Sequence, residues 1–264
     1  MSSSDIDQFL NFAEALVDAV KPTIMSQFRS NFRVDTKDDT TPVTETDRAA
    51  ELMLRQMIET RYPNHGILGE EFGIKRPDAD FVWVIDPIDG TKSFICGKPT
   101  FGILIALIHR QRPILGVIDI PASGDRWVGA LNRKTKFNDM DASVRSCNKL
   151  SLAWLCATSH IMFTPKNYKK FCLLENSCSN IILGTDCMGY GLLASGWVDL
   201  VCEDTLAIYD FAAHIPIIEG AGGAIRDWDG APLKLDLTQN EKCFSVIASG
   251  DISLLKSVVS ILND

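Results

Sequence analysis

The stretch Phe-Val-Trp-Val-Ile-Asp-Pro-Ile-Asp-Gly-Thr, residues 81–91, is the most informative part of the sequence. Residues 81–85 are all apolar, as expected for a buried strand. The run ends in Asp86 and Asp89, two carboxylates three residues apart on a turn that contains proline. Because such carboxylates repel one another, the turn predicts either a raised pKa or a cation between them. The alternative interpretation is an Asp-rich turn that only caps a helix at Lys92.

Magnesium suits the chemistry of this turn. It takes hard oxygen ligands in octahedral geometry and leaves positions for water or phosphate. The backbone carbonyl of Ile88 lies inside the turn and could supply another oxygen. Gly90 permits close approach of the backbone, Thr91 offers a hydroxyl, and the amides beyond them could face an anion. The turn therefore predicts a divalent cation next to an anionic group.

Two other positions could contribute carboxylates to the same site. Glu70 follows the apolar pair Ile67-Leu68, at the end of a possible strand, and Asp210 begins an otherwise apolar helical pattern. Taken singly, Glu70 is also consistent with a solvated loop and Asp210 with a helix N-cap. Strand ends and a helix start could converge on a cation cluster, but spacing alone leaves that convergence open.

The first half of the chain combines helices with a cluster of strands. Residues 5–20 have apolar side chains at helical spacing, and the polar residues 30–41 indicate a loop. A second helix is predicted from Thr44, with Asp47 as its capping-box partner. Further strand-like runs lie at residues 101–108, 113–120 and 126–131. This order favours an α+β half, residues 1–135, that has a mainly antiparallel sheet and holds most of the metal ligands.

The second half, residues 136–264, alternates strand-like and helical patterns. Strands are predicted at residues 150–158, 181–183, 197–202 and 244–249. Helices are predicted at residues 186–195, 210–220 and 252–262. The alternation favours an α/β half that carries the substrate-side residues. Since no repeat or linker separates the halves, we expect one continuous fold of mixed α+β and α/β class.

Composition excludes several classes of function. The chain of 264 residues has 26 Lys and Arg against 34 Asp and Glu, a net charge of −8, which argues against a nucleic-acid partner. Lysine clusters at residues 134–136 and 166–170 are interpreted as solvated loops. No apolar run approaches the ~20 residues that span a bilayer, so no membrane partner is expected. The eight cysteines form no CxxC pair and no secretory signal pattern precedes them, which predicts a cytoplasmic location.

Three blocks of the sequence resemble the inositol monophosphatase superfamily. They are Gly69-Glu70-Glu71, residues 83–91, and residues 209–213 followed by 219–223. They occur in the family's order and at its usual separations, and the resemblance is weakest over residues 132–180. It implies a layered αβαβα sandwich of the sugar-phosphatase type, a homodimer, and magnesium-dependent hydrolysis of a small phosphate monoester.

Within that superfamily the chain is most similar to the histidinol-phosphate phosphatases. The supporting stretches are residues 41–44, 92–94, 126–129, 191–196 and above all 208–211. Inositol-type members usually have Trp-Asp where this chain has Tyr209-Asp210. The resemblance implies hydrolysis of L-histidinol phosphate to L-histidinol and phosphate, a late step of histidine biosynthesis. His160, Thr185 and Met188 depart from the family on the expected substrate side.

Three alternative functions stay open at this point. The first is the hydrolysis of inositol-1-phosphate or another sugar phosphate. The second is a metal-free hydrolase that uses paired carboxylates as acid and base. The third is a noncatalytic scaffold of the same fold. The complete acidic set argues against a scaffold, because a chain without catalysis would be free to lose one of its members.

Carried over position by position, the resemblance implies a metal-ligand set. Glu70, Asp86 and the Ile88 carbonyl would bind one Mg²⁺, and Asp86, Asp89 and Asp210 a second. A weaker third ion would depend on Glu70. One ion would lower the pKa of a bound water, and the other would stabilise the leaving alkoxide.

The resemblance also implies catalytic and binding roles. Thr91 would orient the attacking water with support from Asp47, beside Glu70, and the amides of Gly90 and Thr91 would hold phosphate oxygens. Lys37 occupies the loop where the family often has a basic residue near the metals.

Asp186, Glu203 and Tyr209 are the candidates for binding the alcohol part of the substrate. The alternatives are a helix N-cap for Asp186 and a surface strand end for Glu203. His214 lies four residues after Asp210, the spacing of two zinc ligands on one helix face. We favour an ordinary helix histidine packed near Pro216 and assign it no catalytic role.

Overall fold

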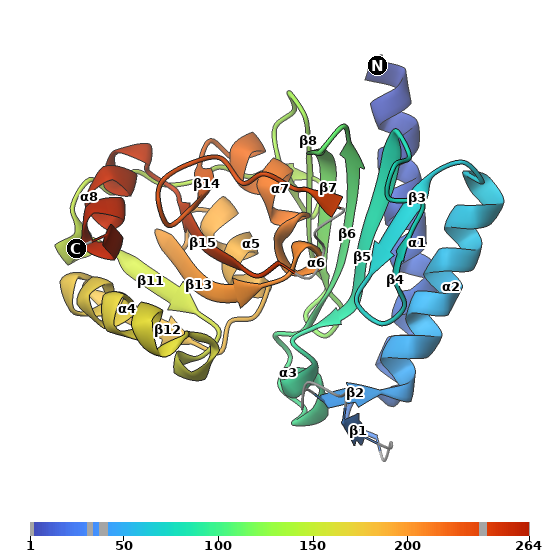
Figure 1. Ribbon diagram of the computed structural model, residues 1–264, viewed down its shortest axis with the longest axis horizontal. Helices are drawn as coiled ribbons and strands as arrows, with labels where there is room; N and C mark the ends of the chain where they lie inside the picture. The colour runs from blue at the N-terminus through green and yellow to red at the C-terminus, as the bar shows by residue number, and fades with distance from the viewer. Residues whose placement is uncertain (1–2, 31–33, 37–41, 238–241, 264) are drawn as a thin grey trace.

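The computed structural model describes residues 3–30, 34–36, 42–237 and 242–263. Two sheets and their helices form five layers. In Figure 1, α1 (Ser3–Gln27) and α2 (Glu45–Arg61) cover the outer face of one sheet. The helices α5 (Met188–Ala194), α6 (Ile208–Phe211) and α7 (His214–Gly220) lie between the sheets. The helices α4 (Pro165–Ser177) and α8 (Ile252–Asn263) cover the far side of the second sheet. The prediction of a layered αβαβα sandwich is confirmed.

The first sheet has eight strands in the order β10-β9-β8-β7-β6-β5-β3-β4. Its strands are β3 (Gly66–Gly69), β4 (Gly73–Lys75), β5 (Phe81–Asp89), β6 (Gly102–His109), β7 (Arg112–Ile120), β8 (Asp125–Ala130), β9 (Lys136–Phe137) and β10 (Met140–Asp141). The pairing of β3 with β5 is parallel, and the others are antiparallel. The short α3 (Thr91–Ile95) separates β5 from β6.

Strand β5 extends beyond the apolar run and includes both carboxylates of the turn. Its pairing with β6 shifts register between Asp86 and Asp89, the signature of a β-bulge. The bulge re-aims side chains at the end of a strand whose residues 82–88 are buried. This buried strand thus delivers two acidic residues to the edge of the core.

The outer layer consists of α1 (Ser3–Gln27) and α2 (Glu45–Arg61). The α1 helix is longer than predicted and buries one apolar stripe, including Leu16 and Val20, against the sheet. The α2 helix begins as expected, with Thr44 as N-cap and Asp47 completing a capping box. Residues 30–41 are not all loop, because β1 (Val34–Thr36) pairs with β2 (Pro42–Thr44).

The second sheet has five strands in the order β12-β11-β13-β15-β14. They are β11 (Trp154–Ala157), β12 (Asn180–Leu183), β13 (Leu200–Leu206), β14 (Ala224–Asp227) and β15 (Phe244–Ser249). Strand β13 lies later in the chain than the predicted residues 197–202, and β11 is shorter than predicted.

The helices of this half are α4 (Pro165–Ser177), α5 (Met188–Ala194), α6 (Ile208–Phe211), α7 (His214–Gly220) and α8 (Ile252–Asn263). The loop interpretation of residues 166–170 is wrong, because they lie in α4. The single helix predicted over residues 210–220 is two helices, α6 and α7, which break at Ala212 and Ala213.

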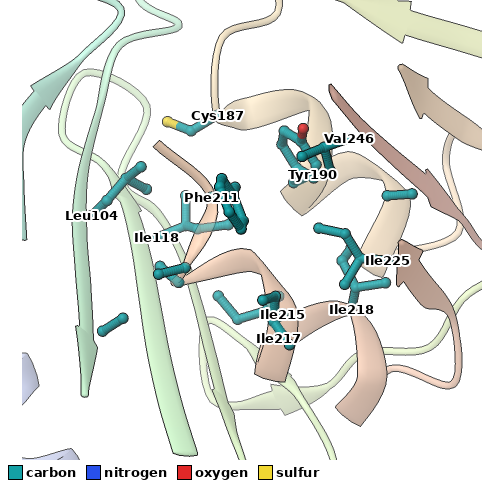
Figure 2. Packing of buried hydrophobic residues seen from close by; sticks show 14 of the residues in the cluster. Leu104, Ile118, Cys187, Tyr190, Phe211, Ile215, Ile217, Ile218, Ile225 and Val246 are labelled. Atoms are coloured by element: carbon teal, nitrogen blue, oxygen red, sulfur yellow. The ribbon is translucent and has the colours of Figure 1, made fainter. Parts of the chain in front are cut away.

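Apolar side chains of both sheets meet across the middle helical layer. Figure 2 shows Leu104 and Ile118 of the first sheet packed toward Phe211 and the isoleucines of α7, with Val246 of the second sheet on the other side. Phe211 is fully buried in this cluster. Its neighbour Asp210 is therefore anchored by core packing. None of the helices in the described part of the chain is long and apolar enough to cross a membrane.

Candidate active site

Three carboxylates converge at the end of β5. Oxygen atoms of Asp86, Asp89 and Asp210 lie within 4.8 Å of one another, although Asp210 is more than a hundred residues further along the chain. Asp86 is 1% exposed, whereas Asp89 and Asp210 are partly exposed. Three of the sequence-predicted metal ligands, from both halves of the chain, thus meet in one cluster.

Backbone amides hold each carboxylate of the cluster. The Ile88 amide donates to Asp86 Oδ1 at 3.0 Å, and the Ala207 amide donates to Asp210 Oδ2 at 2.7 Å. Asp210 is the third residue of α6 and not the helix start that the sequence suggested. Asp89 Oδ2 accepts from the amide of Cys187 at 2.8 Å, so the second half of the chain fixes a carboxylate of the first.

The burial and close spacing of the carboxylates in this cluster favour a bound cation. Burial, followed by the charges of Glu70 and Asp89, raises the pKa of Asp86 well above its ordinary value. Burial and then Asp186 raise the pKa of Asp89 to about 8, and burial and then Glu70 raise the pKa of Asp210. Ionised carboxylates held in this way are stabilised by a bound cation. The all-oxygen donor set fits Mg²⁺.

Glu70 directly follows β3 and lines the cavity beside this cluster. The loop after it is held by Glu51, a fully buried carboxylate on α2. Glu51 accepts the amides of Glu71 at 2.7 Å and Phe72 at 3.1 Å, and it pairs with Arg55 at 2.7 Å. Sequence reasoning missed Glu51, because Glu and Arg four residues apart resemble a surface pair.

We expect Glu51→Ala to weaken Mg²⁺ binding by about 10- to 100-fold, as loss of an outer-shell partner typically does. The amides of Glu71 and Phe72 lose their acceptor, and Glu70 then loses its fixed position. Titration calorimetry with MgCl₂ measures the effect. Glu45→Ala removes an exposed carboxylate from the same helix and serves as the control. Equal Mg²⁺ affinity in the two variants would contradict this role of Glu51.

Thr91 begins α3 directly after the β5 turn, and Asp47 lies in the first turn of α2. The hydroxyl of Thr91 donates to the carbonyl of Ile88 at 3.2 Å. Asp47 is 1% exposed, and its Oδ2 accepts the backbone amide and the hydroxyl of Thr44. Its Oδ1 has no hydrogen-bond partner among the described residues, and its charge contributes to the raised pKa of Asp86. Asp47 is therefore both a capping residue and a neighbour of the acidic cluster.

A cavity of about 260 Å³ adjoins the cluster. Glu70, Asp89, Gly90, Thr91 and Asp210 line it together with Asp186, Glu203 and His214. Glu203 is 3% exposed, and its two oxygens accept the Thr158 amide and the Tyr190 hydroxyl, each at 3.0 Å. Glu203 is thus a buried, fixed carboxylate and not a surface residue.

Asp186 lies in the same cavity but not at a helix start. Its backbone has φ of 46°, and α5 begins two residues later. Tyr209 is not among the described residues that line the cavity. It lies beside the acidic cluster, where burial and then the charge of Asp210 raise its pKa.

The other predicted positions are less central. Lys37 lies outside the described residues. Of the three departures from the family pattern, His160 hydrogen-bonds Glu175 at 3.3 Å, Thr185 is buried and Met188 is half-buried.

His214 is fully buried and packs face to face on Tyr190, with ring centroids 4.0 Å apart. Neither ring nitrogen has a hydrogen-bond partner among the described residues, and the three-carboxylate cluster does not include it. Burial lowers the pKa of His214 to about 3, so the ring is neutral.

This burial predicts a pH effect on stability. Between about pH 6.5 and 3 the unfolded chain binds a proton at His214 that the folded chain does not, so stability falls as the pH falls through this range. His214→Phe keeps a ring against Tyr190 and removes the proton. Between pH 7 and 5 the metal-free variant should lose about 2 kcal/mol less free energy of unfolding than the wild type. Urea unfolding at the two pH values measures this, and equal losses would contradict it.

Comparisons with known proteins agree with this geometry. Residues 5–259 match the model of the inositol monophosphatase family. The chain is 46% identical to the bifunctional phosphatase IMPL2 of Arabidopsis thaliana over 255 residues, covering 95% of this chain and 74% of that protein. It is 34% identical to a histidinol-phosphatase of Chlorobaculum parvum, covering 88% of this chain and 89% of that protein.

A solved structure of an inositol monophosphatase from Zymomonas mobilis has the same fold. The two superimpose with a TM-score of 0.88 and 41% identity, and each is covered over 100% of its length. Together with the match over nearly all of the sequence, this similarity establishes the family. The chain belongs to the inositol monophosphatase family.

Proposed function

We propose that this protein is a Mg²⁺-dependent phosphatase whose preferred substrate is L-histidinol phosphate, which it hydrolyses to L-histidinol and phosphate. The observation that carries the proposal is the convergence of Asp86, Asp89 and Asp210 beside a cavity that also contains Asp186 and Glu203. A dianionic phosphate enters such an acidic cavity favourably only with cations present. The extra carboxylates suit a substrate with a cationic alcohol part.

The chain's own residues would hold the metal ions. Glu70, Asp86 and the carbonyl of Ile88 would bind one ion, and Asp86, Asp89 and Asp210 the second, with a weaker third at Glu70. When bound, the ions would supply an activated water and neutralise the charge of the phosphate. The raised pKa values of the metal-free carboxylates support this assignment, because they reflect charge that lacks compensation.

Thr91, Asp47 and the β5 turn would position the water and the phosphate. The Thr91 hydroxyl already lies at the Ile88 carbonyl, and Asp47 Oδ1 is buried with an unused acceptor position. Together with Glu70, these groups could orient a water and accept its proton. The amides of Gly90 and Thr91 would face the phosphate oxygens, because the left-handed backbone of Gly90 turns the chain sharply at this point.

Glu203 and Asp186 would recognise the alcohol part of the substrate. Both are carboxylates nine-tenths or more buried that line the cavity, and they would accept charge-assisted hydrogen bonds from the ammonium and imidazole of histidinol. Tyr209 does not line the cavity and has no part in this recognition. Relatives named as histidinol-phosphatases support this choice of alcohol.

Hydrolysis of inositol-1-phosphate is the second candidate. The Zymomonas mobilis protein of the same fold, described as an inositol monophosphatase, favours it. A cavity lined by carboxylates could also accept hydroxyl hydrogen bonds from an inositol ring. The alcohol part of histidinol phosphate carries positive charge, whereas that of inositol-1-phosphate does not. A preference for histidinol phosphate would therefore indicate that Asp186 and Glu203 bind a cationic group.

The deciding experiment is phosphate release with MgCl₂ from histidinol phosphate, inositol-1-phosphate and glucose-6-phosphate side by side. We expect a kcat/KM for histidinol phosphate at least about tenfold above the others, about 1.4 kcal/mol of discrimination. EDTA should abolish the activity. Equal rates would reject the specific substrate and leave a general phosphatase. No release from any substrate, with Mg²⁺ bound, would favour the noncatalytic scaffold.

A further inference from the structure

Asp186 occupies an unusual place for a residue that only contacts substrate. It comes from the loop before α5 in the second half of the chain, yet its side chain lies against the β5 turn of the first half. A Cβ atom added to Gly90 would lie 2.8 Å from Asp186 Cγ and 3.1 Å from Oδ1. Asp186 also has a left-handed backbone, which a residue other than glycine adopts at a cost.

One carboxylate oxygen of Asp186 accepts hydrogen bonds from the first half of the chain. Oδ2 accepts the hydroxyl of Ser93 at 2.6 Å and also the hydroxyl of Thr100. Ser93 is the third residue of α3, and Thr100 lies in the loop between α3 and β6. The two hydroxyls therefore come from the helix that follows the turn and from the loop after that helix. The hydroxyls themselves lie 3.3 Å apart. The carboxylate therefore joins α3, the loop after it and the second half of the chain.

Two neighbouring contacts reinforce this attachment. The Cys187 amide donates to Asp89 Oδ2 at 2.8 Å, and Lys98 Nζ donates to the carbonyl of Gly184. The helix that follows Gly90 has only five residues. So short a helix has little stability of its own and takes its orientation from tertiary contacts. The orientation of the Gly90 and Thr91 amides must therefore come from outside α3.

We propose that Asp186 is a positioning residue of the phosphate-binding turn, acting through the hydroxyls of Ser93 and Thr100. Oδ2 holds α3 and thereby the amides of Gly90 and Thr91, while Oδ1, which accepts neither of these two hydroxyls, stays available to the alcohol part of the substrate. The proposal rests on the proposed function for the identity of the phosphate site. It differs from substrate recognition in one respect: loss of the Oδ2 contacts affects every phosphate monoester equally.

The test removes the two hydroxyls and leaves Asp186 in place. For the Mg²⁺-loaded Ser93→Ala/Thr100→Val variant, we expect kcat/KM to fall about tenfold or more, by the same factor for histidinol phosphate, inositol-1-phosphate and 4-nitrophenyl phosphate. The affinity for inorganic phosphate, measured by calorimetry, should fall in parallel. Ser93→Ala/Thr100→Ser, which restores one hydroxyl, should recover part of both losses.

Two results would overturn the proposal. One is wild-type activity and phosphate affinity in the double variant, and the other is a loss confined to histidinol phosphate. If the double variant does not fold, Thr100→Val alone, which keeps the shape of the side chain, is measured in the same way. If the wild type showed no preference for histidinol phosphate, the proposed substrate would be rejected. The loss of kcat/KM across all substrates and the phosphate affinity of the double variant would still decide the role of Asp186.

Discussion

Asp89→Asn should lower kcat about a thousandfold, equivalent to about 4 kcal/mol of transition-state stabilisation. Asp89 is one of the three clustered carboxylates, and an amide has the same shape but cannot supply the negative charge that holds a divalent cation. The amide oxygen can still accept the Cys187 hydrogen bond, so the local structure should persist. Phosphate release at saturating MgCl₂ measures the loss, and turnover within a few-fold of the wild type would refute the metal assignment.

The same substitution should not destabilise the metal-free protein. The pKa of Asp89 is raised to about 8 in the folded state, so its contribution to stability is present below about pH 4 and is lost as the pH rises through 8. At pH 8 metal-free Asp89→Asn should therefore unfold at a higher urea concentration than the metal-free wild type. Asp78→Asn, at an exposed turn, is the control and should match the wild type in both activity and stability.

Gly90→Ala is expected to have the second-largest effect. Gly90 has φ of 78°, and an added Cβ would lie 2.8 Å from Asp186 Cγ and 3.0 Å from Asp186 Cβ. The left-handed backbone alone costs a non-glycine residue about 1–2 kcal/mol. The clash must in addition displace either the turn or Asp186. We expect kcat/KM to fall about a hundredfold, because a displacement of about 1 Å in the turn is enough for that.

Gly124→Ala provides the matched control for this variant. Gly124 has φ of 77°, nearly the same backbone, but no heavy atom lies within 4 Å of the position of its added Cβ. Gly124→Ala should have a lower free energy of unfolding in urea, because alanine is strained in a left-handed backbone, and it should keep wild-type activity. If Gly90→Ala lost no more activity than Gly124→Ala, the close packing of Asp186 on the turn would have no functional role.

Local pattern was sufficient for the elements with strong periodicity or strong capping chemistry. The apolar run of β5, the capping box at Thr44 and the apolar stripe of α1 are properties of neighbouring residues, so they could be predicted. Where the local signal was weak, prediction failed. The α4 helix buries only Phe171 and Leu174, and its lysines suggested a loop. Thr164 as N-cap, followed by Pro165 at the first position, was the signal available for it.

The candidate site divides in the same way. The residue types in the turn after β5 indicated the chemistry, since closely spaced carboxylates favour either a retained proton or a bound cation. Spacing left open whether Glu70 and Asp210 join the set, and the family resemblance assigned them to it. Which carboxylates meet was decided by the packing of the two sheets around α6, where Phe211 anchors Asp210 beside Asp86.

The contacts of Glu51 and Asp186 with remote segments emerged only from the tertiary structure. In the sequence, Glu51 looks like half of a surface ion pair, and Asp186 looks like either the start of a helix or a residue that binds the substrate. Their partners lie about 20 and 90 residues away in the chain. The sequence by itself determined the buried strand and its acidic turn and predicted a cation there, because these depend on adjacent residues. The tertiary structure decided which distant amides and hydroxyls hold those carboxylates, because hydrogen bonds between remote segments exist only after the two sheets have packed together.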